Sequence, residues 1–336
     1  MNGLTTNTFG ALDLRVAIER FPIAGAFTIS RGSRTEAVVV TATVSDGVHE
    51  GRGECVPYAR YGETVDGVAG DLAEQSVRLR QGGDQATLTG GLKAGAARNA
   101  LDCALWDLAA KRAGVRVWDL TGTGEPRPLT TCYTLSLGDP ASMEAAARAA
   151  SARPLLKVKL GGEGDEARIA AVRRGAPDAR IVVDANEAWT EASFDRHVAA
   201  CLAAGIALIE QPLPAANDAA LAHLHSPIPI CADESFHGLD SLALIMERYD
   251  AINIKLDKTG GLTAALAVAA AARANEMPVM VGCMLGTSLA MAPAMLIAAG
   301  AAFVDLDGPL LLAKDRDPGL RFEGSTVHSY GPELWG

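Results

Sequence analysis

The second part of the chain alternates short apolar runs, rich in β-branched residues, with longer alanine-rich runs in which apolar residues recur at helical spacing. This alternation is typical of βα units and predicts a parallel sheet. Eight strands in such an order favour a closed barrel, whose active site lies at the carboxyl ends of the strands. The predicted strands are 132–136, 155–160, 181–184, 207–210, 228–233, 251–255, 279–282 and 303–305. A doubly wound open sheet is the alternative fold, but no G-x-G-x-x-G motif follows a strand.

The pattern before residue 122 is different. Residues 37–44 (AVVVTATV) predict a strand, and the turn signal that follows them leads to a second strand at 49–54, so we expect a hairpin. Residues 94–113 carry an apolar stripe at helical spacing, and Gly114 ends that predicted helix. The segment GTGEPRP at 122–128 predicts a linker. We therefore expect an α+β domain over 1–122, a barrel over 123–315, and a C-terminal segment, 316–336, that packs back on the first domain.

Composition narrows the function classes. The chain has 336 residues, of which 49% are hydrophobic, and its net charge is −10. These values are typical of a globular protein with a large core and argue against nucleic acid as a partner, because nucleic-acid binding needs clustered basic residues. The apolar run 289–304 is too short to cross a membrane, and residues 1–15 show no secretory signal, so we expect a cytoplasmic protein without a membrane partner.

Polar residues end six of the predicted barrel strands. They are Lys159, Asp184, Glu210, Asp233, Lys255 and Asp305. Three carboxylates at adjacent strand ends would converge and repel one another unless a cation binds between them. Oxygen-only ligands favour Mg²⁺ over zinc, so we predict a magnesium site on Asp184, Glu210 and Asp233. The alternative for each carboxylate taken singly is a helix cap or the partner of an arginine.

Lysines accompany the predicted metal site. Lys157 and Lys159 are two apart on one strand and therefore share a face, which the apolar neighbours suggest is the barrel interior. Burial beside like charge lowers the pKa of a lysine, so we expect an amine able to act as a base. Lys255 ends the sixth strand, across the barrel from the second. Lys159 and Lys255 could then remove a proton α to a metal-bound carboxylate from one face and return it from the other, which inverts the stereocentre.

At these residues the sequence resembles the enolase superfamily, in its muconate-cycloisomerase-like branch. The motifs are KVK at 157–159, DAN at 184–186, EQP at 210–212, ADES at 232–235 and NIK at 253–255. The resemblance implies a modified (β/α)7β TIM barrel under an α+β capping domain, Mg²⁺ on the three carboxylates, with Mn²⁺ able to replace it, and Lys159 and Lys255 as the acid/base pair. Cycloisomerases, succinylbenzoate synthases and N-acylamino acid racemases share most of these motifs.

A second resemblance concerns the substrate. The Asp305-x-Asp307 pair resembles the signature of the dipeptide epimerases, in which both carboxylates bind the substrate's α-ammonium group, and a buried cation does need an anionic partner. The alternative is a pair of loop carboxylates that cap a helix. Residues 27–34 (FTISRGSR) resemble a capping loop of the Ala-Glu epimerase group, which implies Arg31 or, by preference, Arg34 as the partner of a glutamate side chain. The remaining substrate-binding candidates are Thr134, Ser136 and Lys157.

These observations lead to one hypothesis and several rivals. We expect an isomerase that epimerises a dipeptide of the L-Ala-L-Glu type at its C-terminal residue, with the dipeptide as its small-molecule partner and a homo-oligomer as one possible assembly. The alternatives within the superfamily are an N-acylamino acid racemase and a cycloisomerase or lyase. A metal-dependent peptide-binding barrel would have no use for the two lysines, and a Schiff-base aldolase would not need three carboxylates.

Overall fold

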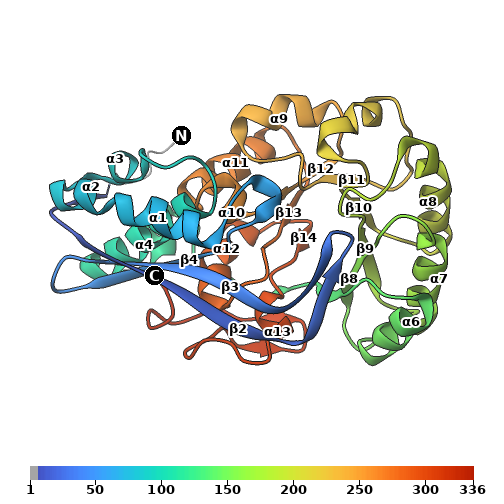
Figure 1. The fold of residues 1–336 in the computed structure, drawn as a ribbon, viewed down its shortest axis with the longest axis horizontal. Helices are drawn as coiled ribbons and strands as arrows, with labels where there is room; N and C mark the ends of the chain where they lie inside the picture. Colours follow the sequence, from blue (N-terminus) through green and yellow to red (C-terminus); the bar gives the residue numbers. More distant parts are fainter. Residues whose placement is uncertain (1–6) are drawn as a thin grey trace.

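The computed structural model describes residues 7–336. Residues 1–6, which belong to the segment 1–15 where the sequence shows no secretory signal, lie outside the described residues. An antiparallel three-stranded sheet and a group of helices form the N-terminal part (Figure 1). The sheet consists of β2 (Asp13–Ile29), β3 (Gly32–Ser45) and β4 (Glu50–Cys55). The helices are η1 (Ala59–Tyr61), α1 (Val65–Glu74), α2 (Ser76–Gln81), α3 (Gln85–Thr89), α4 (Ala96–Ala113) and α5 (Val117–Thr121). A short pair, β1 (Thr8–Phe9) with β5 (Gly83–Asp84), completes it.

The predicted hairpin is present as β3 and β4, but sequence reasoning missed β2, the longest strand. Most side chains of β2 are exposed or half-buried, so its sequence lacks the clear apolar alternation that marks β3. The helix α4 packs closely on β4. A Cβ at Gly51 would lie 2.2 Å from the Ala104 carbonyl oxygen, and one at Gly53 would lie 2.1 Å from that of Ala100, so only glycine fits at both positions.

The second part is the predicted parallel barrel. Its strands pair in sequence order, and the backbone N–H of Cys132 donates to the Val304 carbonyl oxygen at 2.7 Å, which joins the first and last strands. The strands are β7 (Tyr133–Leu135), β8 (Leu155–Lys159), β9 (Arg180–Asp184), β10 (Leu208–Glu210), β11 (Ile230–Ala232), β12 (Ala251–Ile254), β13 (Val279–Val281) and β14 (Phe303–Val304). Six of them end one residue before the predicted ends, and β9 and β10 end where predicted. The predicted TIM-type barrel is confirmed.

Helices cover the outside of the barrel, one after each strand but the last (Figure 1). They are α6 (Pro140–Ala149), α7 (Asp165–Gly175), α8 (Glu191–Ala203), the 3₁₀ segment η2 (Ala215–Ala222), α9 (Leu239–Met246), α11 (Leu262–Ala274) and α12 (Ser288–Ala298). Two short additional helices, α10 (Leu256–Thr259) and α13 (Gly308–Leu311), lie in the segments that follow β12 and β14. No helix among residues 7–336 is long and apolar enough to cross a membrane.

The interior of the barrel is apolar at one end and charged at the other. The apolar end is a separate cluster of side chains from all eight strands or the residues next to them, among them Val182, Leu208 and Met280. Side chains two residues further along these strands, such as Lys157 and Asp184, are equally buried but charged. Because side chains on a strand alternate, two further residues return to the same face, so the charges lie directly above the apolar layer.

The C-terminal segment returns to the N-terminal part. The indole N–H of the buried Trp335 donates to the Cys103 carbonyl oxygen of α4 at 3.1 Å, and the N–H of Val117 donates to the Gly336 carbonyl oxygen at 3.0 Å. Strand β16 (Thr326–Val327) joins β15 (Phe322–Glu323) to β6 (Leu129–Thr130), just beyond the linker. We therefore propose the division into 1–122, with 316–336 packed on it, and 123–315.

The hairpin of β2 and β3 places its tip above the charged end of the barrel (Figure 1). The N–H of Leu137, after β7, donates to the Thr28 carbonyl oxygen at 2.9 Å, and the Ser30 hydroxyl donates to the Asn186 carbonyl oxygen at 3.1 Å. These contacts join two distant parts of the chain and form one wall of the candidate site.

Candidate active site

Three carboxylates meet at the charged end of the barrel. Asp184 and Glu210 end β9 and β10 and are register partners, and Asp233 directly follows β11. All three side chains are buried, and one oxygen of each lies within 4.8 Å of the others. The predicted convergence of these residues is present because adjacent parallel strands end at the same level of the sheet.

Each carboxylate has one oxygen held by a donor from the scaffold. The Asn186 N–H donates to Asp184 Oδ1 at 2.9 Å, Asn253 Nδ2 donates to Glu210 Oε1 at 2.8 Å, and Lys258 Nζ donates to Asp233 Oδ1 at 2.6 Å. The second oxygen of each carboxylate faces the interior. Three oriented, oxygen-only ligands with supporting hydrogen bonds fit a hard divalent cation such as Mg²⁺.

Three lysines surround the inward oxygens. Lys159 Nζ lies 2.6 Å from Asp184 Oδ2, and Lys255 Nζ lies 2.7 Å from Asp233 Oδ2. Lys157 Nζ lies 2.7 Å from both Glu210 Oε2 and Asp305 Oδ2. Lys157 and Lys159 both point into the barrel, as their spacing predicts. Lys159 and Lys255 come from the second and sixth strands and line the same cavity.

The predicted lowering of the pKa is wrong for Lys157, and Lys255, for which no pKa shift was predicted, also has a raised pKa. Burial disfavours the charged form of Lys255, but the carboxylates of Asp233 and Glu210 outweigh burial and raise its pKa. The same balance, with Asp305 as the nearest carboxylate, raises the pKa of Lys157. The sequence argument counted burial and the like charges and gave too little weight to the carboxylates.

The carboxylates respond to this crowding in opposite directions. Burial and the charge of Asp184 raise the pKa of Glu210 to about 7. Burial acts against ionisation of Asp184 as well, but Lys159 and Lys157 lower its pKa to about 2. Such divergent pKa values in one cluster are typical of functional sites.

Asp305 and Asp307 follow β14 and lie in the same cluster. Both are buried and line a small cavity of about 30 Å³ together with Lys159 and Thr134. Asp305 Oδ2 is paired with Lys157, whereas its Oδ1 has no hydrogen-bond partner among residues 7–336. Asp307 Oδ2 accepts from the backbone N–H of Thr134 at 2.6 Å. Asp307 precedes α13 but makes no side-chain cap bond to it, which argues against the helix-cap alternative.

Thr134 therefore reaches the site through its backbone. Its N–H donates to the carboxylate of Asp307. Ser136, which was predicted to bind the substrate, instead bonds to the capping hairpin. The Ser136 hydroxyl accepts from the Thr28 N–H at 3.2 Å and donates to the Ala26 carbonyl oxygen at 3.3 Å, so it fastens the hairpin to the barrel.

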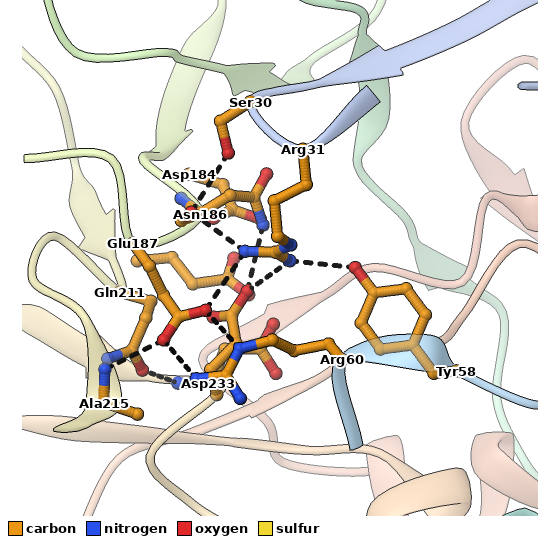
Figure 2. A network of polar contacts seen from close by, with 12 residues as sticks. Ser30, Arg31, Tyr58, Arg60, Asp184, Asn186, Glu187, Gln211, Ala215 and Asp233 are labelled. Atoms are coloured by element: carbon orange, nitrogen blue, oxygen red, sulfur yellow. Dashed lines mark hydrogen bonds and ion pairs between the residues drawn. The ribbon is translucent and has the colours of Figure 1, made fainter. Parts of the chain in front are cut away.

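The capping domain closes one side of a cavity of about 460 Å³ that contains Lys159 and Lys255 on its barrel side. Arg31 and Arg34 both line this cavity but differ in their contacts. The Arg31 guanidinium bonds to Asn186, Glu187, Tyr58 and Glu234 (Figure 2). The Arg34 guanidinium has no ion pair among residues 7–336 and lies 5.9 Å from the centre of the Tyr58 ring.

Sequence reasoning missed several residues that support the site. Asn253 could have been predicted, since it lies in β12 two positions before Lys255 and therefore on the same face of the strand. Asn186 could not, because it follows the end of β9 and has a left-handed backbone that breaks the alternation. Lys258 lies three residues after Lys255, within α10, and no periodic signal marks it. The role of Glu187 and Glu234 could be identified only from their contacts with the capping domain.

Comparisons with known proteins agree with this architecture. The N-terminal domain model of mandelate racemase and muconate lactonizing enzyme matches residues 11–122, and the enolase C-terminal domain-like model matches residues 141–318. The L-Ala-D/L-Glu epimerase of Escherichia coli K12 is 44% identical over 94% of this chain and 99% of its own length. An N-acetyl-D-glutamate racemase of a Pseudoalteromonas species is 41% identical over 89% of this chain and 95% of its own.

A solved structure is similar throughout. It is an enolase family member from Agrobacterium tumefaciens, described as having homology to dipeptide epimerases and as binding sodium and L-Ala-L-Glu. Its TM-score is 0.95 at 55% identity, with 97% of this chain and 100% of that chain covered. The relatives are named as an epimerase and a racemase, both isomerases, so the prediction of an isomerase is confirmed. With both domain models matched and the carboxylates and lysines at the strand ends, the chain belongs to the enolase superfamily.

Proposed function

We propose that this protein epimerises dipeptides of the L-Ala-L-Glu type at the C-terminal residue, by a two-base transfer of the α-proton. The observation that carries the proposal is the unpaired Oδ1 of the buried Asp305, next to Asp307 and within the same cluster as the two lysines. A buried carboxylate oxygen without a donor is costly, and the ammonium group of a dipeptide would supply that donor. The names of the Escherichia coli and Agrobacterium relatives support this substrate class.

The proposed metal ligands are Asp184, Glu210 and Asp233, with Mg²⁺ as the preferred ion and Mn²⁺ as a substitute. A divalent cation held there would bind the substrate's carboxylate. It would also stabilise the negative charge that develops on that carboxylate when the α-proton leaves. The three carboxylates fit this task because each has an inward oxygen and a second oxygen fixed by the scaffold.

The chain's own groups then move the proton. Lys159 and Lys255 lie on opposite strands, so a Cα placed between them presents one face to each amine. One lysine, in its neutral form, accepts the proton at Nζ, and the other, charged, donates one from the opposite face. The carboxylates of Asp233 and Glu210 raise the pKa of Lys255, and a divalent cation held by them would offset that effect and make the neutral form accessible. Lys157 remains paired with Asp305 and Glu210, and its positive charge partly neutralises these two carboxylates.

We further propose that Arg34, and not Arg31, binds the glutamate side chain of the substrate, because the guanidinium of Arg31 is already engaged by four residues. Arg34→Met is expected to lower kcat/KM for L-Ala-L-Glu by about 10- to 150-fold, the value of a charge-assisted hydrogen bond. L-Ala-L-Gln has the same shape without the charge, so its kcat/KM should change little. An equal loss for both dipeptides would contradict this role of Arg34.

An N-acylamino acid racemase is the second candidate, and the Pseudoalteromonas relative favours it. Its substrates carry no ammonium group, so they leave Asp305 Oδ1 without a donor. The geometry of this chain therefore favours the dipeptide.

The experiment that tests the function is proton NMR of the purified protein with Mg²⁺ and L-Ala-L-Glu in D₂O. We expect the glutamate α-proton signal to disappear and the signals of L-Ala-D-Glu to appear, and neither change to occur after EDTA treatment. If the α-proton persists while Mg²⁺ is bound, this dipeptide is not the substrate. If N-acetyl-L-glutamate reacts in its place, the second candidate is correct.

A further inference from the structure

Two segments of the capping domain meet on the loop that follows β9. Arg31, at the tip of the hairpin, donates through Nη1 to the Asn186 carbonyl oxygen at 2.9 Å and to Glu187 Oε2 at 3.2 Å. Arg60, in η1, makes two bonds of 2.7 Å to the carboxylate of Glu187. Figure 2 shows both guanidinium groups converging on this loop from the capping side.

Arg31 also reaches a second loop. Its Nη2 donates to Glu234 Oε1 at 2.7 Å and to the Tyr58 hydroxyl at 2.8 Å. Glu234 follows β11, and its side chain is only 1% exposed. Among residues 7–336, Arg31 is the only ion-pair partner of Glu234, so a buried carboxylate depends on one guanidinium from another domain. Removal of such a partner leaves an uncompensated buried charge, which is strongly destabilising.

Two of the four residues that accept hydrogen bonds from Arg31, Asn186 and Glu234, are directly connected to proposed metal ligands. The Asn186 N–H donates to Asp184 Oδ1 at 2.9 Å, and Asn186 Nδ2 donates to Glu234 Oε1 at 3.3 Å. Glu234 is the neighbour of Asp233 in the chain. Arg31 thus bridges the loops that follow β9 and β11, the strands whose ends place Asp184 and Asp233.

The backbone around Asn186 needs such support. Asn186 has a φ of 45° and Glu187 a φ of 67°, both in the left-handed region that residues other than glycine rarely adopt. Conformations of this kind persist only where surrounding contacts hold them. The bonds from Arg31 and from the Ser30 hydroxyl to the Asn186 carbonyl oxygen are two of these contacts.

We propose that Arg31 is a positioning residue for the metal centre: from the capping hairpin it holds Asn186 and Glu234, and through them the ligands Asp184 and Asp233, in the geometry that binds the ion. The inference rests on the metal site of the proposed function. It assigns Arg31 a role separate from that of Arg34, although the two lie three residues apart on one hairpin. Docking of the hairpin on the barrel then increases the affinity for the metal ion, and binding of the metal ion stabilises the docked hairpin to the same degree.

Arg60 provides a matched control. It is also a capping-domain arginine paired with Glu187, but none of its bonds reaches Asn186 or Glu234. Arg31→Met and Arg60→Met therefore both weaken the attachment of the cap to Glu187, whereas only Arg31→Met releases the two groups beside the metal ligands.

The test is calorimetric titration of the EDTA-dialysed protein with Mg²⁺, without substrate. We expect Arg31→Met to weaken Mg²⁺ binding by about 10- to 100-fold, as for other groups that orient metal ligands. Arg60→Met should stay within about twofold of the wild type. Because Arg31→Met leaves Glu234 unpaired and can unfold the protein, Arg31→Met/Glu234→Gln is compared with Glu234→Gln, where the arginine substitution should still weaken binding by about tenfold.

The outcomes separate this inference from the function it rests on. Wild-type Mg²⁺ affinity in a folded Arg31→Met, or equal affinity in Glu234→Gln and the double variant, overturns the positioning role alone. Equal weakening in Arg31→Met and Arg60→Met does the same, since it assigns the effect to the attachment of the cap. A wild-type protein that binds no Mg²⁺ overturns the metal site and this inference together.

Discussion

Lys159→Ala and Lys255→Ala are each expected to abolish epimerisation of L-Ala-L-Glu. The expected loss in kcat is about 10²- to 10⁴-fold or more. The two amines lie at the ends of strands on opposite sides of the barrel and line one cavity, so neither can take over the face that the other serves. The loss is in the proton transfer itself. Binding of Mg²⁺ should persist in both variants, because the three carboxylates remain.

Solvent exchange separates the roles of the two lysines. In D₂O each variant should still exchange the α-proton of one epimer of Ala-Glu, and the two variants should differ in which epimer exchanges. NMR of both epimers with both variants checks this. Lys314→Ala, the same substitution at an exposed lysine away from the site, serves as the control and should epimerise normally. Normal epimerisation by both Lys159→Ala and Lys255→Ala would show that the two-base mechanism is wrong.

Asp307→Asn is expected to lower kcat/KM for L-Ala-L-Glu by at least about 30-fold, because loss of one partner of a buried charge pair costs about 2–5 kcal/mol. The asparagine can still accept from the Thr134 N–H, so the local backbone bond is retained. Asp305→Asn should have a similar effect on the dipeptide, but it also removes a partner of Lys157, which makes Asp307 the cleaner position.

N-acetyl-L-glutamate is the discriminating substrate for these variants. It has no ammonium group, so any activity on it should survive Asp307→Asn or rise. Steady-state kinetics with both substrates measures the difference. An equal loss with both would assign Asp307 a structural role and remove the support for a dipeptide substrate.

The pH dependence of KM provides a second readout for Asp307. Burial and the neighbouring Asp305 raise the pKa of Asp307 to about 7, so this carboxyl is protonated below that pH and charged above it. An ammonium group binds to the charged form. KM for the dipeptide is therefore expected to rise as the pH falls below about 7, and this rise should be absent in Asp307→Asn.

The periodic part of the chain allowed the barrel and the centre of its site to be predicted. In a parallel barrel every strand ends at the same rim, so chain order alone brings Asp184, Glu210 and Asp233 together. Alternation along β8 likewise directs Lys157 and Lys159 to one face. The long strand β2 was missed because most of its side chains are exposed and its pattern therefore carries little signal.

The sequence by itself determined the barrel, the carboxylates, the lysines and the Asp305-x-Asp307 pair, since each depends on spacing within a strand or on the order of strands. Only the tertiary structure decided which arginine has no ion pair among residues 7–336, because Arg31 bonds to partners 155 and 203 residues away in the chain. It also decided the direction of the lysine pKa shifts. Both depend on distances between charges from separate strands and domains, and no local pattern in the chain records such distances.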